Sequence, residues 1–226
     1  MTLRRRPLLL QALGAAATLG APALVAAAAS TLLPPMTDGP FYPAPRWRDR
    51  PGGSRDWDAD LTRVAGAAAP ARGDHLALAL TLADARGRVI DGAEVEIWQC
   101  DTLAAYRHPR VAADAGRFDP GFQGFGSARS GRDGGVRFRT IRPVPYPGRT
   151  PHIHVKLRHP SFGETTSQLF VAGDPGNAGD FLWRQLDATA QQALAMVLQP
   201  APSAPAAAGG DPALRWVVQH DLRLPG

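Results

Sequence analysis

Two histidines stand two residues apart in a short alternating segment, and this pattern constrains the fold more than any other feature of the chain. The segment reads His152-Ile153-His154-Val155. Successive side chains of a β-strand point to opposite faces, so the two histidines share one face, whereas the two aliphatic residues share the other and suit a core. Two neighbouring imidazoles on a rigid strand make half of a metal site. A strand surface with two solvated histidines is the simpler interpretation of the pattern alone.

Short alternating runs elsewhere in the chain also predict strands. They cover residues 75–83, 89–90 with 93–100, 136–141, 164–171 and 214–224. Glycine (24 residues) and proline (22 residues) are concentrated between such runs and indicate turns. Residues 119–126 form a Phe/Gly-rich turn region, and residues 180–198 have apolar residues at roughly helical spacing. The sequence therefore predicts an all-β fold, an antiparallel β-sandwich core with long loops and one short helix.

The first residues of the chain have the composition of a targeting segment. Arg5 and Arg6 precede an apolar run that extends from residue 8 to residue 28 and ends in small residues. The arginine pair resembles a twin-arginine signal, so we expect export, to the periplasm. An ordinary secretory signal or a retained anchor are the alternatives. We interpret residues 1–29 as the export signal and residues 30–226 as a single domain, since that length suffices for one sizeable core.

Charge and cysteine content exclude several classes of function. The net charge is +5, but setting aside Arg4, Arg5 and Arg6 leaves 22 basic against 20 acidic residues. Because no basic stripe is interleaved with aromatic residues, we expect no nucleic-acid partner, and no membrane contact beyond the export signal. Cys100 is the only cysteine, so the chain cannot form an internal disulfide or a cysteine-based zinc or iron–sulfur site. Any metal must bind histidine, tyrosine or carboxylate.

Tyrosine is the ligand type that narrows the choice of metal. The chain has three tyrosines, and one of them, Tyr146, is held between Pro145 and Pro147 beside the histidine segment. A phenol has an ordinary pKa of about 10 and ionises at neutral pH only beside a strong positive charge such as a metal cation. Phenolate is a hard, electron-donating ligand and suits ferric iron. Two phenolates with two imidazoles would hold Fe(III) and leave room for an exogenous ligand.

These residues lie within a longer stretch that resembles a known family. Trp98-Gln99 is followed by Tyr106 and then by residues 138–154, which read FRTIRPVPYPGRTPHIH. This set resembles the intradiol ring-cleavage dioxygenases, and within them the protocatechuate 3,4-dioxygenase-like branch. Residues 37–43 and 119–126 also resemble segments of that family. The resemblance covers roughly residues 35–171.

The resemblance implies the cofactor and the roles of particular residues. It implies a non-haem Fe(III) ion with four protein ligands: Tyr106, Tyr146, His152 and His154. By position, Tyr146 and His154 would be the axial ligands. Arg149 matches the arginine that stabilises charge on the substrate ring, and Gln168 matches a glutamine beside it. Gly39 and Pro40 would line the substrate mouth, and Tyr146 would act as a general base when substrate displaces it from the metal.

The function implied is cleavage of a catechol-type aromatic by O2 between its two hydroxyl-bearing carbons, which gives a cis,cis-muconate-type dicarboxylate. Three departures from better-known members leave the substrate open: the chain has no helical N-terminal dimerisation segment, a short link from Tyr146 to His152, and an export signal on what reads as a stand-alone chain. A homo-oligomer is compatible with the sequence. An exported β-sandwich module that binds a metal or ligand without turnover is the alternative, and a zinc or copper hydrolase that uses His152 and His154 is a second one.

Overall fold

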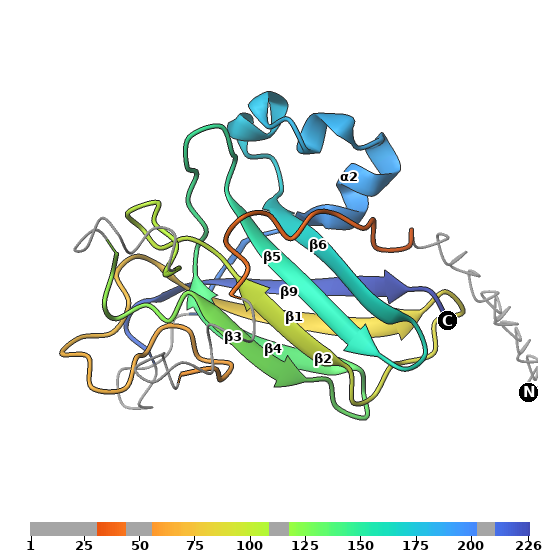
Figure 1. The fold of residues 1–226 in the computed structure, drawn as a ribbon, viewed down its shortest axis with the longest axis horizontal. Helices are drawn as coiled ribbons and strands as arrows, with labels where there is room; N and C mark the ends of the chain where they lie inside the picture. Colours follow the sequence, from red (N-terminus) through yellow and green to blue (C-terminus); the bar gives the residue numbers. More distant parts are fainter. Residues whose placement is uncertain (1–30, 44–55, 109–117, 203–210) are drawn as a thin grey trace, which may run out of the picture.

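Two β-sheets face each other across an apolar core in the computed structural model, which describes residues 31–43, 56–108, 118–202 and 211–226 (Figure 1). The four-stranded sheet has the order β4 (Gly135–Ile141), β1 (His75–Asp84), β9 (Leu214–Leu224), β8 (Gln199–Pro200). The five-stranded sheet has the order β3 (Phe125–Arg129), β2 (Glu94–Trp98), β5 (His152–His159), β6 (Gly163–Val171), β7 (Ala195–Met196). The predicted all-β sandwich with one short helix is confirmed.

Most neighbouring strands are antiparallel, as predicted, but two pairs are parallel. β9 runs parallel to β1 over its whole length, and β7 runs parallel to β6. A parallel pair needs a long crossover, and residues 172–194 supply the one between β6 and β7. The last strand, β9, lies in the middle of the four-stranded sheet, between β1 and β8.

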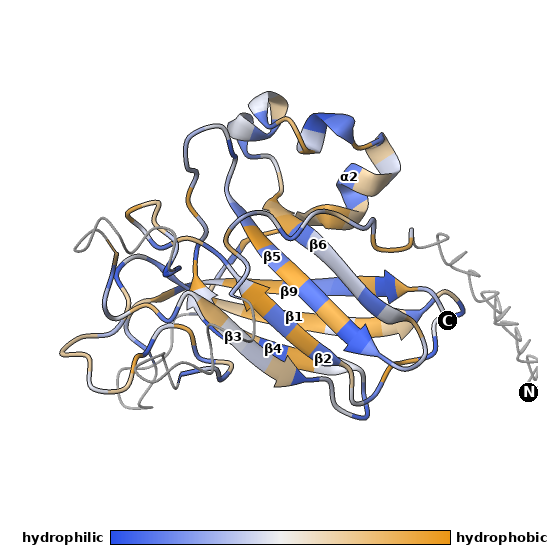
Figure 2. Cartoon of the chain, viewed as in Figure 1, coloured by the Kyte–Doolittle hydropathy of each residue, from blue (hydrophilic) through white to orange (hydrophobic). Residues whose placement is uncertain are grey.

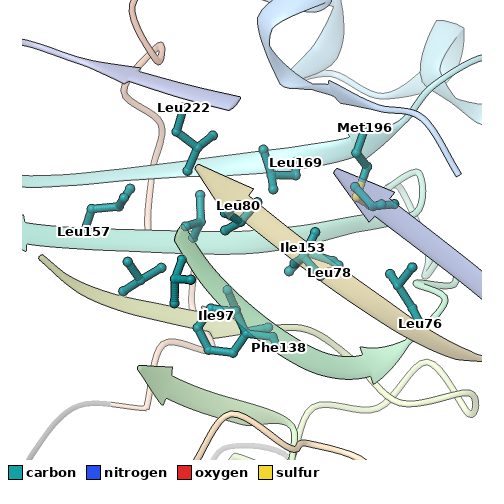
Figure 3. Packing of buried hydrophobic residues seen from close by; sticks show 14 of the residues in the cluster. Leu76, Leu78, Leu80, Ile97, Phe138, Ile153, Leu157, Leu169, Met196 and Leu222 are labelled. Atoms are coloured by element: carbon teal, nitrogen blue, oxygen red, sulfur yellow. The ribbon is translucent and has the colours of Figure 1, made fainter. Parts of the chain in front are cut away.

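Alternating side chains on each strand build the core between the sheets. On β5, Ile153 and Leu157 point inward and are fully buried against Leu78 and Leu80 of β1 (Figure 3). The alternation of apolar and polar residues is visible along β2 and β5 in Figure 2. Because the period of a strand is two residues, this inward set leaves the intervening residues of β5 on the outer face of the five-stranded sheet.

The helix predicted over residues 180–198 is much shorter in the structure. The region contains the 3₁₀ turns η2 (Pro175–Gly179) and η3 (Trp183–Gln185), followed by the single helix α2 (Ala188–Leu194). Asp187 caps α2 by accepting a hydrogen bond from the Ala190 amide at 2.7 Å. The chain then leaves the helix to pair with β6 as β7, and Phe181 and Val197 remain exposed. Strand pairing therefore overrides the apolar spacing.

One further local prediction is wrong, and another is right only in part. Residues 89–90 form no strand, and Val89 makes only an isolated bridge to Ala83. The predicted turn region 119–126 ends inside a strand, because Phe125 and Gly126 begin β3, which pairs with β2. Residues 125–126 are too few for periodicity to decide, so that pairing with β2 determines their conformation.

His75, the first residue of β1, is buried. Its Nδ1 lies 2.6 Å from Asp211 Oδ2 and its Nε2 lies 2.9 Å from the Ala71 carbonyl oxygen. The Asp211 carboxylate also accepts a hydrogen bond from Arg139 at 2.9 Å. This network ties the chain before β9 to β1 and β4.

The predicted export signal, residues 1–29, lies outside the described residues. Within the part of the chain that the structure describes, no helix is long and apolar enough to cross a membrane.

Candidate metal centre

The outer face of the five-stranded sheet carries both histidines of the alternating segment. His152 and His154 are each 2% exposed, and they point away from the core on β5. In the sheet register, His154 lies between Trp98 of β2 and Gln168 of β6. The Trp98 and His154 rings stack with centroids 4.7 Å apart and an interplanar angle of 9°. Trp98 is buried and fixes the orientation of this imidazole.

Four aromatic rings form a closed circuit at this face, from Tyr106, Tyr146, His152 and His154. The centroid distances around the circuit are 5.7 Å between the tyrosines, 5.5 Å from Tyr146 to His152, 4.9 Å between the histidines and 6.3 Å from His154 to Tyr106. The structure therefore brings together all four residues that the sequence proposed as ligands, from three separate segments of the chain.

A tight turn places Tyr146 beside Arg149. The Arg149 amide donates to the Tyr146 carbonyl oxygen at 2.8 Å, and the Tyr146 amide donates in the other direction at 3.2 Å. Proline at the second position of a turn presets φ, and glycine at the third position supplies the positive φ of a type II turn. Pro147 and Gly148, whose φ is +81°, occupy these positions. The turn leaves Arg149 Nη1 3.4 Å from the Tyr146 hydroxyl oxygen.

A carboxylate-supported loop holds the other tyrosine. Asp101 Oδ1 accepts hydrogen bonds from the amides of Leu103 and Ala105 at 2.8 and 3.0 Å. Its Oδ2 accepts a hydrogen bond from the Asp119 amide at 2.6 Å, which fastens the loop to the segment before β3. Tyr106, at the end of this loop, is 5% exposed, in contrast to the half-buried Tyr146.

Three polar atoms of the ring circuit are buried without a hydrogen-bond partner in the described part of the chain. They are Tyr106 Oη, His152 Nε2 and His154 Nδ1. A buried polar atom without a partner costs roughly 1–3 kcal/mol, so several together indicate a missing ligand or ion. The other nitrogen of His152, Nδ1, lies 2.7 Å from the Thr150 carbonyl oxygen. A backbone acceptor for one ring nitrogen is the usual arrangement when the second nitrogen binds a metal.

The electrostatics of the ring circuit match a cation. Burial, together with the Arg149 charge, lowers the pKa of His152 to about 4, and burial with neighbouring His152 lowers the pKa of His154 well below its ordinary value. Both imidazoles are therefore neutral, the form that binds metals. Burial and the nearby Tyr146 phenol raise the pKa of Tyr106 well above its usual range. That phenol will ionise only when a cation is present, and phenolate with imidazole fits ferric iron.

Other metal-binding groups are scarce around the ring circuit. Burial raises the pKa of the Cys100 thiol to about 12, and this thiol donates to the Val144 carbonyl oxygen at 3.6 Å. Among the described residues, no group of three or more His, Cys, Asp or Glu side chains is arranged to hold a metal. A metal at the histidine pair would therefore require the two tyrosines.

The predicted catalytic pair, Arg149 and Gln168, lies beside Tyr146. Arg149 Nη2 donates to Gln168 Oε1, and Gln168 Nε2 donates to the Thr37 carbonyl oxygen at 3.4 Å. Arg149 Nε donates to Asp180 Oδ2 at 2.8 Å, and both side chains of this ion pair are buried. The arginine is thus held by residues from two other segments, with one terminal nitrogen directed at the Tyr146 hydroxyl.

The N-terminal arm, residues 31–43, brings the predicted mouth residues to the same face. The arm crosses β6 and β5 in Figure 1, and the Met36 amide donates to the Thr166 carbonyl oxygen at 2.7 Å. Gly39 has φ of +70°, and a Cβ at this position would lie 3.5 Å from His154 Cε1. Pro40 follows and is exposed. The positive φ favours glycine at position 39, whereas a Cβ there would make only an ordinary van der Waals contact with His154.

Several contributors were missed or only partly recognised in the sequence. Phe41 stacks on Tyr106 with centroids 4.6 Å apart. Tyr42 packs on Trp98 with ring centroids 5.0 Å apart, and its hydroxyl donates to Glu96 Oε2 at 2.7 Å. Asp180, the buried partner of Arg149, had no recognisable signal, because its contacts depend on a connection of 31 residues. For Phe41 and Tyr42, the only signal in the sequence was the aromatic composition of the N-terminal arm.

The chain is similar in sequence to known dioxygenases. The dioxygenase family (Dioxygenase_C) matches residues 45–224. The chain is 32% identical over 126 residues to the protocatechuate 3,4-dioxygenase β chain of Burkholderia cepacia, a match that covers 52% of this chain and 53% of that protein. It is 31% identical over 134 residues to catechol 1,2-dioxygenase of Acinetobacter baylyi, covering 49% of this chain and 40% of that protein. The chain thus spans about half or less of these curated relatives.

Solved structures of dioxygenases share the fold of this chain. The dioxygenase domain of a dioxygenase–carbohydrate-binding protein fusion from Streptomyces sp. SirexAA-E superposes with a TM-score of 0.59 at 26% identity, covering 86% of this chain and 99% of that domain. An intradiol ring-cleavage dioxygenase from Tetranychus urticae has the same fold, with a TM-score of 0.58 at 22% identity over 86% of this chain and 94% of that one. Since the family match extends over most of the sequence, the chain belongs to the dioxygenase family.

Proposed function

We propose that the protein is a non-haem Fe(III) dioxygenase that opens the ring of a catechol-type aromatic between its two hydroxyl-bearing carbons. The observation that carries this proposal is the closed circuit of two phenols and two imidazoles beside the Arg149 guanidinium. One carbon–carbon bond breaks and both atoms of O2 enter the product, a cis,cis-muconate-type dicarboxylate. The reaction balances without an external reductant.

The residues that would hold the metal are Tyr106, Tyr146, His152 and His154. When bound there, Fe(III) would supply a Lewis acid that takes up both substrate oxygens and makes the ring reactive toward O2. The neutral imidazoles and the buried Tyr106 phenol support this assignment, because each gains from a cation that compensates its unpaired atom.

The two tyrosines have different roles in this proposal. Tyr146 is half-buried on a turn whose central residues, Pro147 and Gly148, are exposed, so its phenol can move without disturbing a strand. It would leave the metal when substrate arrives and accept a proton from a substrate hydroxyl. Tyr106 is buried and stacked on Phe41, and it would stay in place throughout.

Arg149 would stabilise the negative charge that develops on the substrate. Its terminal nitrogens face Tyr146 and Gln168, and its orientation is fixed before substrate binds. Preorganised donors of this kind act strongly in a site that excludes water. Gly39 and Pro40, which the arm holds beside His154, would line the mouth through which the substrate enters.

The branch of the family, the export of the protein and its oligomeric state are proposed on separate grounds. The identity to the Burkholderia β chain supports the protocatechuate 3,4-dioxygenase-like branch. The Arg5-Arg6 pair and the apolar run after it support export to the periplasm by a twin-arginine-type signal. A homo-oligomer is compatible with membership of this branch and with export.

The decisive experiment is the visible spectrum of iron-loaded protein. We expect a tyrosinate-to-Fe(III) charge-transfer band that shifts on anaerobic addition of catechol, protocatechuate or hydroxyquinol, and Tyr106→Phe should weaken and shift the resting band. Admission of ¹⁸O₂ should then give a ring-opened dicarboxylate that carries both labelled atoms, detected by mass spectrometry. A colourless iron-replete protein would refute the metal assignment. A coloured protein that binds catechols but yields no product would instead support the binding module without turnover.

A further inference from the structure

Asp180 is a buried carboxylate at the junction between η2 and η3, and both of its oxygens are fully used. Oδ2 accepts hydrogen bonds from Arg149 Nε at 2.8 Å and from the Thr150 amide at 3.0 Å. Oδ1 accepts hydrogen bonds from the amides of Leu182 and Trp183 at 2.9 and 3.1 Å. One oxygen therefore fixes the segment that carries Asp180, and the other reaches across to the turn that precedes β5.

The two contacts of Oδ2 lead to two different parts of the ring circuit. Arg149, held through Nε, directs Nη1 at the Tyr146 hydroxyl. Thr150, held through its amide, offers its carbonyl oxygen to His152 Nδ1 at 2.7 Å. A single oxygen atom thus supports the arginine beside one proposed ligand and the backbone acceptor that orients another.

The surroundings keep this carboxylate charged and in place. Burial alone would raise the pKa of Asp180, but the Thr150 amide and the Arg149 guanidinium together hold it below its usual value. Asn177 from η2 adds a second link, because its Oδ1 accepts a hydrogen bond from Thr150 Oγ1 at 2.8 Å. The segment after β6 is therefore anchored twice to residues 149–150.

We propose that Asp180 is a positioning residue of the ring-cleavage site, which sets the guanidinium of Arg149 against Tyr146 and, through Thr150, sets the ring of His152. This inference rests on the proposed function. Charge-assisted hydrogen bonds to a buried carboxylate give the geometric precision that an arginine needs to meet a developing charge. A carboxylate that only capped η3 would need Oδ1 alone.

The test uses Asp180→Asn, with Asp187→Asn as the matched control. The introduced side-chain amide can still accept from the η3 amides with its carbonyl oxygen, but it then presents an NH2 donor to two donors, Arg149 Nε and the Thr150 amide. Asp187 caps α2 in the same region and has no contact with the ring circuit in the described structure, so its loss reports the effect of removing a cap alone.

The first readout needs neither iron nor turnover. Hydrogen exchange of the Arg149 Nε–H group is followed by NMR in metal-free protein, with the resonance assigned by its loss in Arg149→Lys. We expect exchange to accelerate roughly tenfold or more in Asp180→Asn, because a charge-assisted bond is lost, and to remain unchanged in the control. Unchanged exchange in Asp180→Asn would overturn the proposal.

The second readout is steady-state ring cleavage by the iron-loaded enzyme. We expect kcat of Asp180→Asn to fall on the order of 10²-fold with a much smaller change in KM, as for a misplaced catalytic group. In an Arg149→Ala background, the same substitution should lower kcat by a clearly smaller factor, because only the support of His152 through Thr150 is then left to lose. Equal losses with and without Arg149 would show an independent structural role and refute the positioning.

Two further arms separate the ways in which the test can fail. If Asp180→Asn does not fold, Asp180→Glu keeps the charge but displaces the carboxylate by one methylene, and the same faster exchange and lower kcat are expected. A wild-type protein without ring-cleavage activity would refute the proposed function, and with it the catalytic part of this inference. The exchange measurement would still decide whether Asp180 holds Arg149.

Discussion

The N-terminal arm is fastened to the sheet by an ion pair whose strength can be measured. Lys156 Nζ lies 2.7 Å from Asp38 Oδ2, and it also lies 4.0 Å from the centroid of the Tyr42 ring. The lysine side chain is 4% exposed and the aspartate side chain is 40% exposed. Glu164 Oε1, at 3.5 Å, is a weaker second partner. Removal of Asp38 would therefore leave a buried ammonium with poor compensation.

The expected magnitude follows from this unequal burial. Breaking a fully buried pair by removing one partner costs about 3–5 kcal/mol, whereas an exposed pair contributes about 0–1 kcal/mol. With one buried and one half-buried partner, we expect Asp38→Ala to lower the free energy of unfolding by about 2 kcal/mol. In a double-mutant cycle with Lys156→Met, which keeps the packing of the stem, the coupling energy should be about 1–1.5 kcal/mol.

Urea unfolding of the metal-free protein at pH 7, followed by near-ultraviolet circular dichroism, measures each corner of this cycle. The denaturant slope should be the same for all four proteins, so that midpoints report stability. The exposed pair Arg63–Asp60, with a separation of 3.9 Å, is the control and should give a coupling below about 0.5 kcal/mol. A coupling at Asp38–Lys156 no larger than that of the control would refute the reasoning.

Three other predictions test the metal assignment, the packing and the pH dependence. His152→Ala should lose iron measured by elemental analysis, whereas His108→Ala should retain it, and equal iron content would contradict the assignment. Gly126→Ala should destabilise by about 1–3 kcal/mol in the same urea assay, because its Cβ would meet Leu61 and would lie 2.6 Å from the Asp58 carbonyl oxygen, and a neutral effect would disprove the clash. Burial lowers the pKa of His220, so the unfolded chain binds its proton first as pH falls. The free energy of unfolding should therefore decrease as pH falls from 7.5 to 5.5, and it should decrease less in His220→Gln. Parallel stability curves for the two proteins would argue against this role of His220.

The sequence alone was sufficient wherever a side chain's role depends on its immediate neighbours. The two-residue period placed His152 and His154 on one face of a strand, and the flanking prolines predicted a rigid backbone at Tyr146. Such features depend on backbone sterics within a few residues, so a local pattern is enough to identify them. The ring circuit could then be anticipated from the resemblance of these segments to a family.

Tertiary structure alone decided everything that depends on register and long-range pairing. The strand at residues 125–129 exists because β2 offers it an edge, and the helix stops at Leu194 because the next residues pair with β6. Asp180 reaches Arg149 only because the segment after β6 folds back over the turn. These contacts join residues that are distant in sequence, and their free energy comes from burial and from partners that no local pattern records.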